Sequence, residues 1–291
     1  MARPARAALM AGLALSLALT GCTGGSSKHG RPVQQLAAES PYERAVVAGG
    51  ATALWSFRDA TGLSSRDEVA DLTAGKSTAT VVGGTIATTT GPEGSPAAQF
   101  LRSGRIVTPI TSGLSSADAF SIELDLRADT CVSAWGRVLG TTSLPKSGRE
   151  GFELLHFPKQ FATSPCRFGV EFWHLNAYVG GCHPKAAPVN GVWTHWAVVY
   201  AKNRVTCYEN GALFESSALR GKKPMFLQLG PLGIGGSGSG FQGPLDGASV
   251  GEVAFFRRAL TRAEVVRHAG LSKLAPTSSP APKGSPSPKR S

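Results

Sequence analysis

The sequence predicts an all-β protein, a sandwich of two antiparallel sheets with one short helix near the C-terminal end. Short segments alternate apolar and polar residues, glycine-rich turns separate them, and a single stretch carries a helix-start signal. Hydrophobic residues make up 42% of the 291 residues, which is too many for a disordered chain. The 36 glycines do not follow the strict period of collagen.

The strands are predicted from alternation and from β-branched and aromatic content. Residues 120–126 and 168–172 alternate apolar with polar side chains, and residues 193–200 are rich in Trp and Val. Lys202-Asn203 is a two-residue turn signal between 193–200 and 204–208, so these two segments are expected to form a hairpin.

The predicted helix begins at Thr261. Glu264 follows three residues later, which is the spacing of a capping box, and Val265 and Val266 continue the segment. The predicted domain runs over residues 41–271.

The N-terminal segment indicates export. Arg3 and Arg6 precede an apolar stretch over 7–19, which is too short to span a membrane and fits a signal sequence. The residues Leu19-Thr20-Gly21-Cys22 resemble the lipobox of bacterial lipoproteins. That resemblance implies a signal peptide over 1–21, lipidation of Cys22 and attachment to the outer face of the cell membrane. The alternative is an ordinary secretory signal followed by a chance cysteine.

Two polar segments flank the predicted domain. Residues 22–40 begin with Gly and Ser after the cysteine and predict a flexible stalk. Residues 272–291 hold five Pro, six Ser and four Lys or Arg, and predict a disordered tail. The whole chain carries a net charge of +11, and the tail contributes four of its basic residues. This basic tail either contacts anionic wall polymers or lipids, or only keeps the chain soluble. An exported, lipid-anchored chain is not expected to bind nucleic acid.

Four cysteines remain after Cys22, an even number in an exported chain, and they predict two disulfides. Cys166 and Cys182 flank the expected hairpin and are paired for that reason, which leaves Cys131 with Cys207. Free thiols are the alternative, whereas a zinc site is disfavoured because no Cys-x-x-Cys pair occurs.

The predicted domain resembles the laminin-G-like domains of the concanavalin A-like lectin/glucanase superfamily, and the chain as a whole resembles a bacterial lipoprotein of the actinobacterial kind. The resemblance is carried by 42–57 as opening strand and first loop, 120–126 as a sheet strand, 191–211 as a hairpin, and 232–264 as closing strand and terminal helix. It implies a jelly-roll sandwich over about 230 residues. It does not imply one function, because the superfamily contains lectins, glucanases and structural modules.

Glu123 and Asp125 are the candidate catalytic residues that this resemblance suggests. They lie two residues apart on one strand face, and glycoside hydrolysis needs two carboxyl groups close together. The glucanase pattern has a further Glu two or three positions on, where this chain has Arg127 and Ala128. We therefore expect a solvent-facing strand and no catalysis, with a diverged glycoside hydrolase as the alternative.

Calcium is the one cofactor that the sequence suggests. Asp71 and Asp246 fall where the resemblance places loop acids at the rim of the sandwich, and Asp59 is a third candidate. The alternative is that Asp71 and Asp246 hydrogen-bond their own turns.

Trp173, His174 and Tyr178 are the candidate ligand-binding residues. They lie near the tip of the hairpin expected after 168–172, where aromatic rings are most exposed. The sequence thus favours a surface lipoprotein that binds a glycan or a surface protein through these residues. The alternatives are rings that merely cover the edge of the sandwich beneath a Cys166–Cys182 bridge, and a passive structural module.

Overall fold

The computed structural model describes residues 40–58, 62–75, 77–101, 104–110, 119–131, 135–141, 151–159, 166–220, 231–238 and 245–272. The predicted signal peptide, Cys22, nearly all of the predicted stalk and all but the first residue of the predicted tail lie outside these residues, and so does Asp59. Among the described residues, no helix has the length and apolar character needed to cross a membrane.

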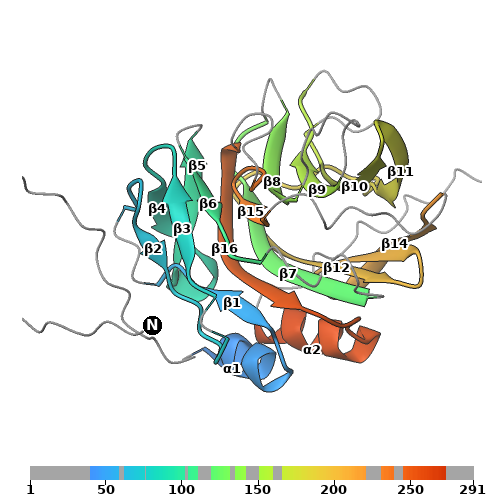
Figure 1. Cartoon of the computed structure of the whole chain (residues 1–291), viewed down its shortest axis with the longest axis horizontal. Helices are drawn as coiled ribbons and strands as arrows, with labels where there is room; N and C mark the ends of the chain where they lie inside the picture. Colours follow the sequence, from blue (N-terminus) through green and yellow to red (C-terminus); the bar gives the residue numbers. More distant parts are fainter. Residues whose placement is uncertain are drawn as a thin grey trace, which may run out of the picture.

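The described residues form two antiparallel eight-stranded sheets, as predicted (Figure 1). Sheet 1 has the order β14-β13-β12-β7-β16-β5-β4, and β1 pairs with β16 beside this path. Its strands are β1 (Ala53–Trp55), β4 (Ala87–Thr90), β5 (Pro96–Leu101), β7 (Ala119–Ala128), β12 (Trp193–Ala201), β13 (Arg204–Glu209), β14 (Ala212–Ala218) and β16 (Asp246–Phe256).

Sheet 2 has the order β11-β10-β9-β8-β15-β6-β3-β2. Its strands are β2 (Glu68–Val69), β3 (Ala79–Val82), β6 (Arg105–Val107), β8 (Gly136–Gly140), β9 (Gly151–His156), β10 (Phe168–His174), β11 (Ala177–Cys182) and β15 (Gly233–Ile234). A 3-10 turn, η1, covers Pro92–Gly94.

The main core lies between the two sheets. Inward-facing side chains of β7, including Phe120 and Leu124, meet those of β9 and β10, including Phe152 and Phe172, and all of them are fully buried. Phe120 lies 5.3 Å from Phe152, centroid to centroid. Each such side chain contributes roughly 1.5–3 kcal/mol when it leaves water, so these faces hold the sandwich together.

The predicted local elements are present. The 193–200 and 204–208 segments lie in β12 and β13, which form a hairpin across Lys202-Asn203, and both turn residues have positive φ, as a type I′ turn requires. Helix α2 (Arg262–Leu271) begins at the N-cap Thr261 with the predicted Glu264 capping box.

The N-terminal element was predicted wrongly. Residues 42–47 were expected in an opening strand, but they lie in helix α1 (Pro41–Ala48). Ser40 and Glu43 form a capping box there, with Pro41 in the first turn, and these residues are a helix-start signal that the sequence analysis missed. Helices α1 and α2 lie side by side against the outer side of sheet 1 (Figure 1).

The disulfide pairing was also predicted wrongly. The bonds join Cys131 to Cys166 and Cys182 to Cys207, with Cα–Cα distances of 5.0 and 6.3 Å. In the β10–β11 register, Val170 is opposite Cys182. Cys166 lies four residues before Val170 and thus roughly 13 Å from it along an extended chain, which is too far from Cys182 for a disulfide.

Both disulfides join sheet 1 to sheet 2. Cys131 follows β7 and Cys207 lies in β13, whereas Cys166 precedes β10 and Cys182 ends β11. Cys182 and Cys207 are fully buried in the main core. The two bonds therefore cross-link the sandwich instead of closing a hairpin.

Candidate functional site

Glu123 and Asp125 are buried, so their predicted exposure to solvent is wrong. Their exposed fractions are 0% and 1%. The alternation of β7 was interpreted correctly, because the side chains of Glu123 and Asp125 lie on the face of the strand that points away from the main core. That face is covered by α1 and α2, whose side chains, such as Tyr42 and Val265, form a second apolar layer with Phe256 and other sheet residues.

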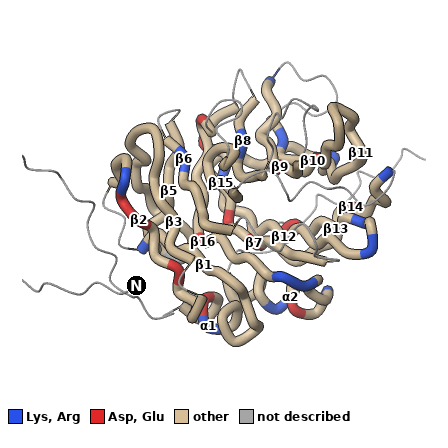
Figure 2. The backbone as a smooth tube through the Cα atoms, in the orientation of Figure 1, with Lys and Arg blue, Asp and Glu red and all other residues tan. Residues whose placement is uncertain are grey.

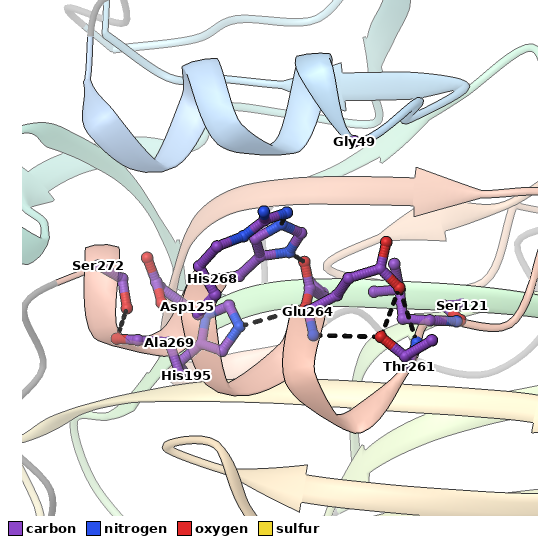
Figure 3. Close-up of polar contacts among 12 residues, drawn as sticks. Gly49, Ser121, Asp125, His195, Thr261, Glu264, His268, Ala269 and Ser272 are labelled. Atoms are coloured by element: carbon purple, nitrogen blue, oxygen red, sulfur yellow. Dashed lines mark hydrogen bonds and ion pairs between the residues drawn. The ribbon is translucent and has the colours of Figure 1, made fainter.

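Two histidines bind these carboxylates beneath the helices. His268 of α2 places Nδ1 2.8 Å from Glu123 Oε2. His195 of β12 places Nδ1 3.1 Å from Asp125 Oδ1 and Nε2 3.7 Å from Glu123 Oε1. Tyr42 of α1 packs edge-on against both imidazoles, at 5.5 and 6.3 Å between centroids. Figure 3 shows Asp125, His195 and His268 gathered between α2 and the strands of sheet 1. We call Tyr42, Glu123, Asp125, His195 and His268 the polar cluster.

Burial and charge shift the pKa values of the polar cluster. Burial lowers the pKa of His195, but hydrogen bonds and charge from Asp125 and Glu123 outweigh it and raise the pKa to about 10. Burial raises the pKa of Glu123, yet the two histidines outweigh it and the net shift is downward. The pKa of Tyr42 is raised well above its usual value, first by burial and then by the neighbouring carboxylates. The cluster therefore holds an ion pair between His195 and Glu123 within sheet 1. The hydrogen bond from His268 to Glu123 attaches α2 to that sheet, and Tyr42 of α1 packs against the two imidazoles.

Glu123 and Asp125 are not accessible to a sugar in this structure. A glycosidase must place both of its carboxyl groups against the sugar, but both helices lie over Glu123 and Asp125, and each carboxylate hydrogen-bonds a histidine through one oxygen. The pattern Glu-x-Asp in β7 thus binds His195 and attaches α2. The capping boxes predict helices at both ends of the domain but not the face on which these helices pack.

The two predicted calcium ligands within the described residues, Asp71 and Asp246, do not lie together. Asp71 is buried and accepts hydrogen bonds from the backbone N–H groups of Leu54, Thr73 and Ser77, at 2.7–2.9 Å, and from the Thr73 hydroxyl at 3.0 Å. Asp71 pairs with Trp55, which lies opposite Val253 of β16.

Asp246 lies at the far end of β16, seven residues from Val253 and thus roughly 20 Å along the strand. The described residues contain no group of three or more His, Cys, Asp or Glu side chains that could hold a metal ion. The alternative interpretation, a turn-bonding role, is correct for Asp71.

Trp173 and Tyr178 come together on the outer face of sheet 2. Their ring centroids are 5.9 Å apart in an edge-to-face arrangement. Leu175 and Asn176 form the tight turn between their strands, both with positive φ. His174 follows Trp173 in β10, so alternation directs it to the opposite face, and we give it no role in this site. The expected Cys166–Cys182 bridge over these rings is not formed. Tyr178 lies in β11, the edge strand of sheet 2, so the alternative that the rings cover the sandwich edge stays open.

Three further rings continue this pair across the sheet. Tyr178 lies 6.1 Å from His183, His183 lies 5.4 Å from Phe157, and Phe157 lies 5.1 Å from Trp135, all between centroids. We call Trp173, Tyr178, His183, Phe157 and Trp135 the aromatic row. Sequence analysis missed the last three, because they follow or precede strands that only the sheet register brings together.

Glycine makes room for the centre of the row. A Cβ on Gly169 would lie 2.5 Å from a ring carbon of Phe157 and 2.8 Å from one of His183. Those distances are too short for real contacts, so the two rings lie directly over the backbone of β10. Any side chain at position 169 displaces them.

Carboxylates border the aromatic row. Trp173 Nε1 donates to Glu171 Oε2 at 3.1 Å, and His183 Nε2 lies 3.6 Å from Glu171 Oε1. Glu153 is directly opposite Glu171 in the β9–β10 register and forms an ion pair with Arg137. Burial lowers the pKa of Arg137 to about 10, although the charge of Glu171 opposes this.

The exposed rings lie at both ends of the row. Trp135 is 42% exposed and Tyr178 40% exposed, whereas Phe157 is fully buried. Burial, together with Glu171 and Glu215, raises the pKa of Tyr178 to about 12, so its hydroxyl is a neutral hydrogen-bond donor. Basic and acidic positions are interspersed around the molecule in the view of Figure 2. The row therefore offers flat apolar faces with a few fixed polar groups, which is the chemistry of a ligand site.

Comparison with protein families decides the relationship. The model of the concanavalin A-like lectin/glucanases superfamily matches residues 102–266, which is more than half of the chain. The chain belongs to this superfamily. Its two-sheet fold agrees with that membership, and no curated protein sequence matches the chain.

Solved structures of the same fold include modules of carbohydrate-active enzymes. Domain 4 of AbnA, an extracellular arabinanase from Geobacillus stearothermophilus in complex with arabinotriose, is 20% identical, with a TM-score of 0.57. The match covers 75% of this chain and 98% of that domain. The sialidase of Trypanosoma rangeli is 13% identical, with a TM-score of 0.56, and the match covers 78% of this chain but 33% of the sialidase.

The binding domain of Paraclostridial Mosquitocidal Protein 1 is 10% identical, with a TM-score of 0.56, over 77% of this chain and 52% of that one. At these identities the likeness shows a shared fold. This superfamily member thus spans about a third of the sialidase that it resembles.

Proposed function

We propose that this chain is a surface lipoprotein whose concanavalin A-like domain binds a glycan outside the membrane, without catalysis. The observation that carries the proposal is the aromatic row, which presents exposed rings at two places on an otherwise ordinary sheet face. Sugar rings have an apolar C–H face that packs on aromatic rings, and hydroxyl groups that need fixed hydrogen-bond partners. Glu171, Tyr178 and His183 supply such partners beside the rings.

The other polar residues on this face favour binding over catalysis. Glu171 is already held by Trp173 and lies beside His183, and Glu153 is paired with Arg137. Glu123 and Asp125 are covered by the helices. The arabinotriose complex of the AbnA domain supports a sugar as the ligand of this fold.

The position of the described ends fits presentation from a membrane anchor. Ser40 caps α1 and Ser272 caps α2, and both helices cover sheet 1. The aromatic row lies on the outer face of sheet 2, on the opposite side of the sandwich. A stalk attached at Ser40 therefore directs the row away from the surface that holds the lipid.

Binding is tested with the chain from which residues 1–21 are removed and in which Cys22→Ser prevents lipidation. The probes are immobilised arabinan, xylan, cellulose, chitin and peptidoglycan. We expect retention on at least one polysaccharide, and a loss of roughly tenfold in affinity for Trp173→Ala and for Tyr178→Ala, since stacked aromatic contacts contribute about 1 kcal/mol or more.

Trp193→Ala is the matched control, because Trp193 is also part-exposed but lies in sheet 1, where it contacts Arg127. Equal binding by all variants would place the ligand elsewhere. If the folded protein binds none of the polysaccharides but binds a surface protein through the same residues, the proposal of a glycan ligand is wrong. Reducing-sugar release by the wild-type chain would contradict the non-catalytic role.

Lipid anchoring is tested separately on whole cells. The wild-type chain is expected in the membrane fraction with labelled fatty acid, and Cys22→Ser is expected in the medium or the soluble fraction without the label. Release of the wild-type chain into the medium would show an ordinary secretory signal.

A further inference from the structure

The aromatic row is long and follows a path that one sugar unit cannot cover. It begins at Trp135 beside β8, crosses to Phe157 after β9, passes over Gly169 of β10 to His183, and then follows the β10–β11 hairpin to Tyr178 and Trp173. Four steps of 5.1–6.1 Å join the five rings.

The two exposed ends are separated by less exposed rings. Trp135 and Tyr178 are 42% and 40% exposed, while Phe157 between them is buried and the side chain of His183 is 31% exposed. A small ligand contacts either Trp135 or the Trp173–Tyr178 pair. A ligand that contacts both must cross three ring steps, over His183 and the buried Phe157.

The polar groups are unevenly placed along the row. Glu171 contacts Trp173 and His183, so fixed acceptors lie at the hairpin end. At the other end the ring of Trp135 is partly exposed and meets the ring of Phe157 in an edge-to-face contact. This arrangement suits a ligand that is held by hydrogen bonds at one end and extends along apolar ring faces to the other.

From this geometry we propose that the aromatic row binds an internal stretch of a linear polysaccharide, lying along the row from Trp135 to Trp173. The inference rests on the proposed glycan-binding function and specifies its ligand. Sugar and aromatic rings are similar in size, so the row accommodates roughly one sugar unit for each ring step, or about four units. Single sugars and chain ends fill only part of it.

The test is titration calorimetry on the wild-type chain without residues 1–21 and with Cys22→Ser. The probes are arabino-, xylo- and cello-oligosaccharides, each from disaccharide to hexasaccharide. In the series that binds, the dissociation constant is expected to fall at least tenfold from the disaccharide to the tetrasaccharide and then to level off.

Trp135→Ala and Trp173→Ala locate the two ends. We expect Trp135→Ala to weaken hexasaccharide binding roughly fivefold to tenfold and to leave disaccharide binding unchanged, because a disaccharide occupies the polar hairpin end. Trp173→Ala is expected to weaken both. Trp193→Ala again serves as the control, and thermal melts verify that each variant is folded.

The outcomes separate this inference from the proposed function. Equal affinity for disaccharide and hexasaccharide, or undiminished hexasaccharide binding by folded Trp135→Ala, would overturn the extended site and leave glycan binding intact. The length dependence is measured on the wild-type chain, so it stands even if a variant fails to fold. Absence of binding to every oligosaccharide and to the immobilised polysaccharides would overturn both proposals.

Discussion

Replacing Glu252 with glutamine is expected to make the protein more stable at alkaline pH. Glu252 lies in β16 beside the polar cluster and is only 7% exposed. Burial and the nearby charge of Asp125 raise its pKa from 4.5 to about 8. Glu252 in turn lowers the pKa of Asp125, which is the effect of a protonated carboxyl group that donates to a carboxylate. A glutamine amide has nearly the same shape and donates the same hydrogen bond without a bound proton.

The sign of the effect follows from proton linkage. Between about pH 4.5 and 8 the folded state holds a proton on Glu252 that the unfolded state has released. The free energy of unfolding therefore falls as pH rises through this range. A shift of this size corresponds to about 5 kcal/mol over the whole range, of which about 3 kcal/mol falls between pH 5 and 8.

Urea unfolding followed by tryptophan fluorescence measures the difference. At about pH 5 the wild-type chain and Glu252→Gln should differ by less than about 1 kcal/mol, and at about pH 8 the variant should be more stable by about 3 kcal/mol. Glu68→Gln is the control, because Glu68 is exposed on β2. Parallel stability curves for wild type and Glu252→Gln, or a less stable variant at about pH 8, would refute the reasoning.

Three further predictions concern other parts of the fold. Gly169→Ala should move Phe157 and weaken oligosaccharide binding severalfold in calorimetry, with a folded protein by circular dichroism; unchanged affinity would show that the row is not the site. Asp71→Ala should lower the free energy of unfolding in urea by roughly 2–4 kcal/mol, because four donors lose their acceptor. A chelator should leave the melting temperature of the wild-type chain unchanged. A melting temperature that depends on calcium would contradict this role. Joint replacement of Cys182 and Cys207 by alanine should cost about 3 kcal/mol, given the loop between them, and a loss below about 1 kcal/mol would count against the cross-link.

The polar cluster illustrates how sequence and structure divide the information. Alternation in 120–126 correctly placed Glu123 and Asp125 on one face and the apolar residues on the other. It could not show what covers the polar face, because that depends on helices at opposite ends of the chain. The same residues therefore looked like an exposed or catalytic pair in the sequence, whereas in the fold they are buried and contact His195 and His268.

The sequence by itself determined the local elements and the fold class. The alternating strands, the Lys202-Asn203 turn and the Thr261–Glu264 cap depend on neighbours in the chain, and all of them were predicted. It also placed Trp173 and Tyr178 together near a hairpin turn, since that pairing too is local.

Only the tertiary structure decided which distant residues meet. The Cys182–Cys207 bond joins two sheets, and the aromatic row joins Trp135 and Phe157 to the β10–β11 hairpin through the register of four strands. Strand register between segments far apart in sequence is set by the burial of whole sheet faces, which no single segment encodes. For that reason the sequence indicated a binding surface at one hairpin, and the fold extended it into a row.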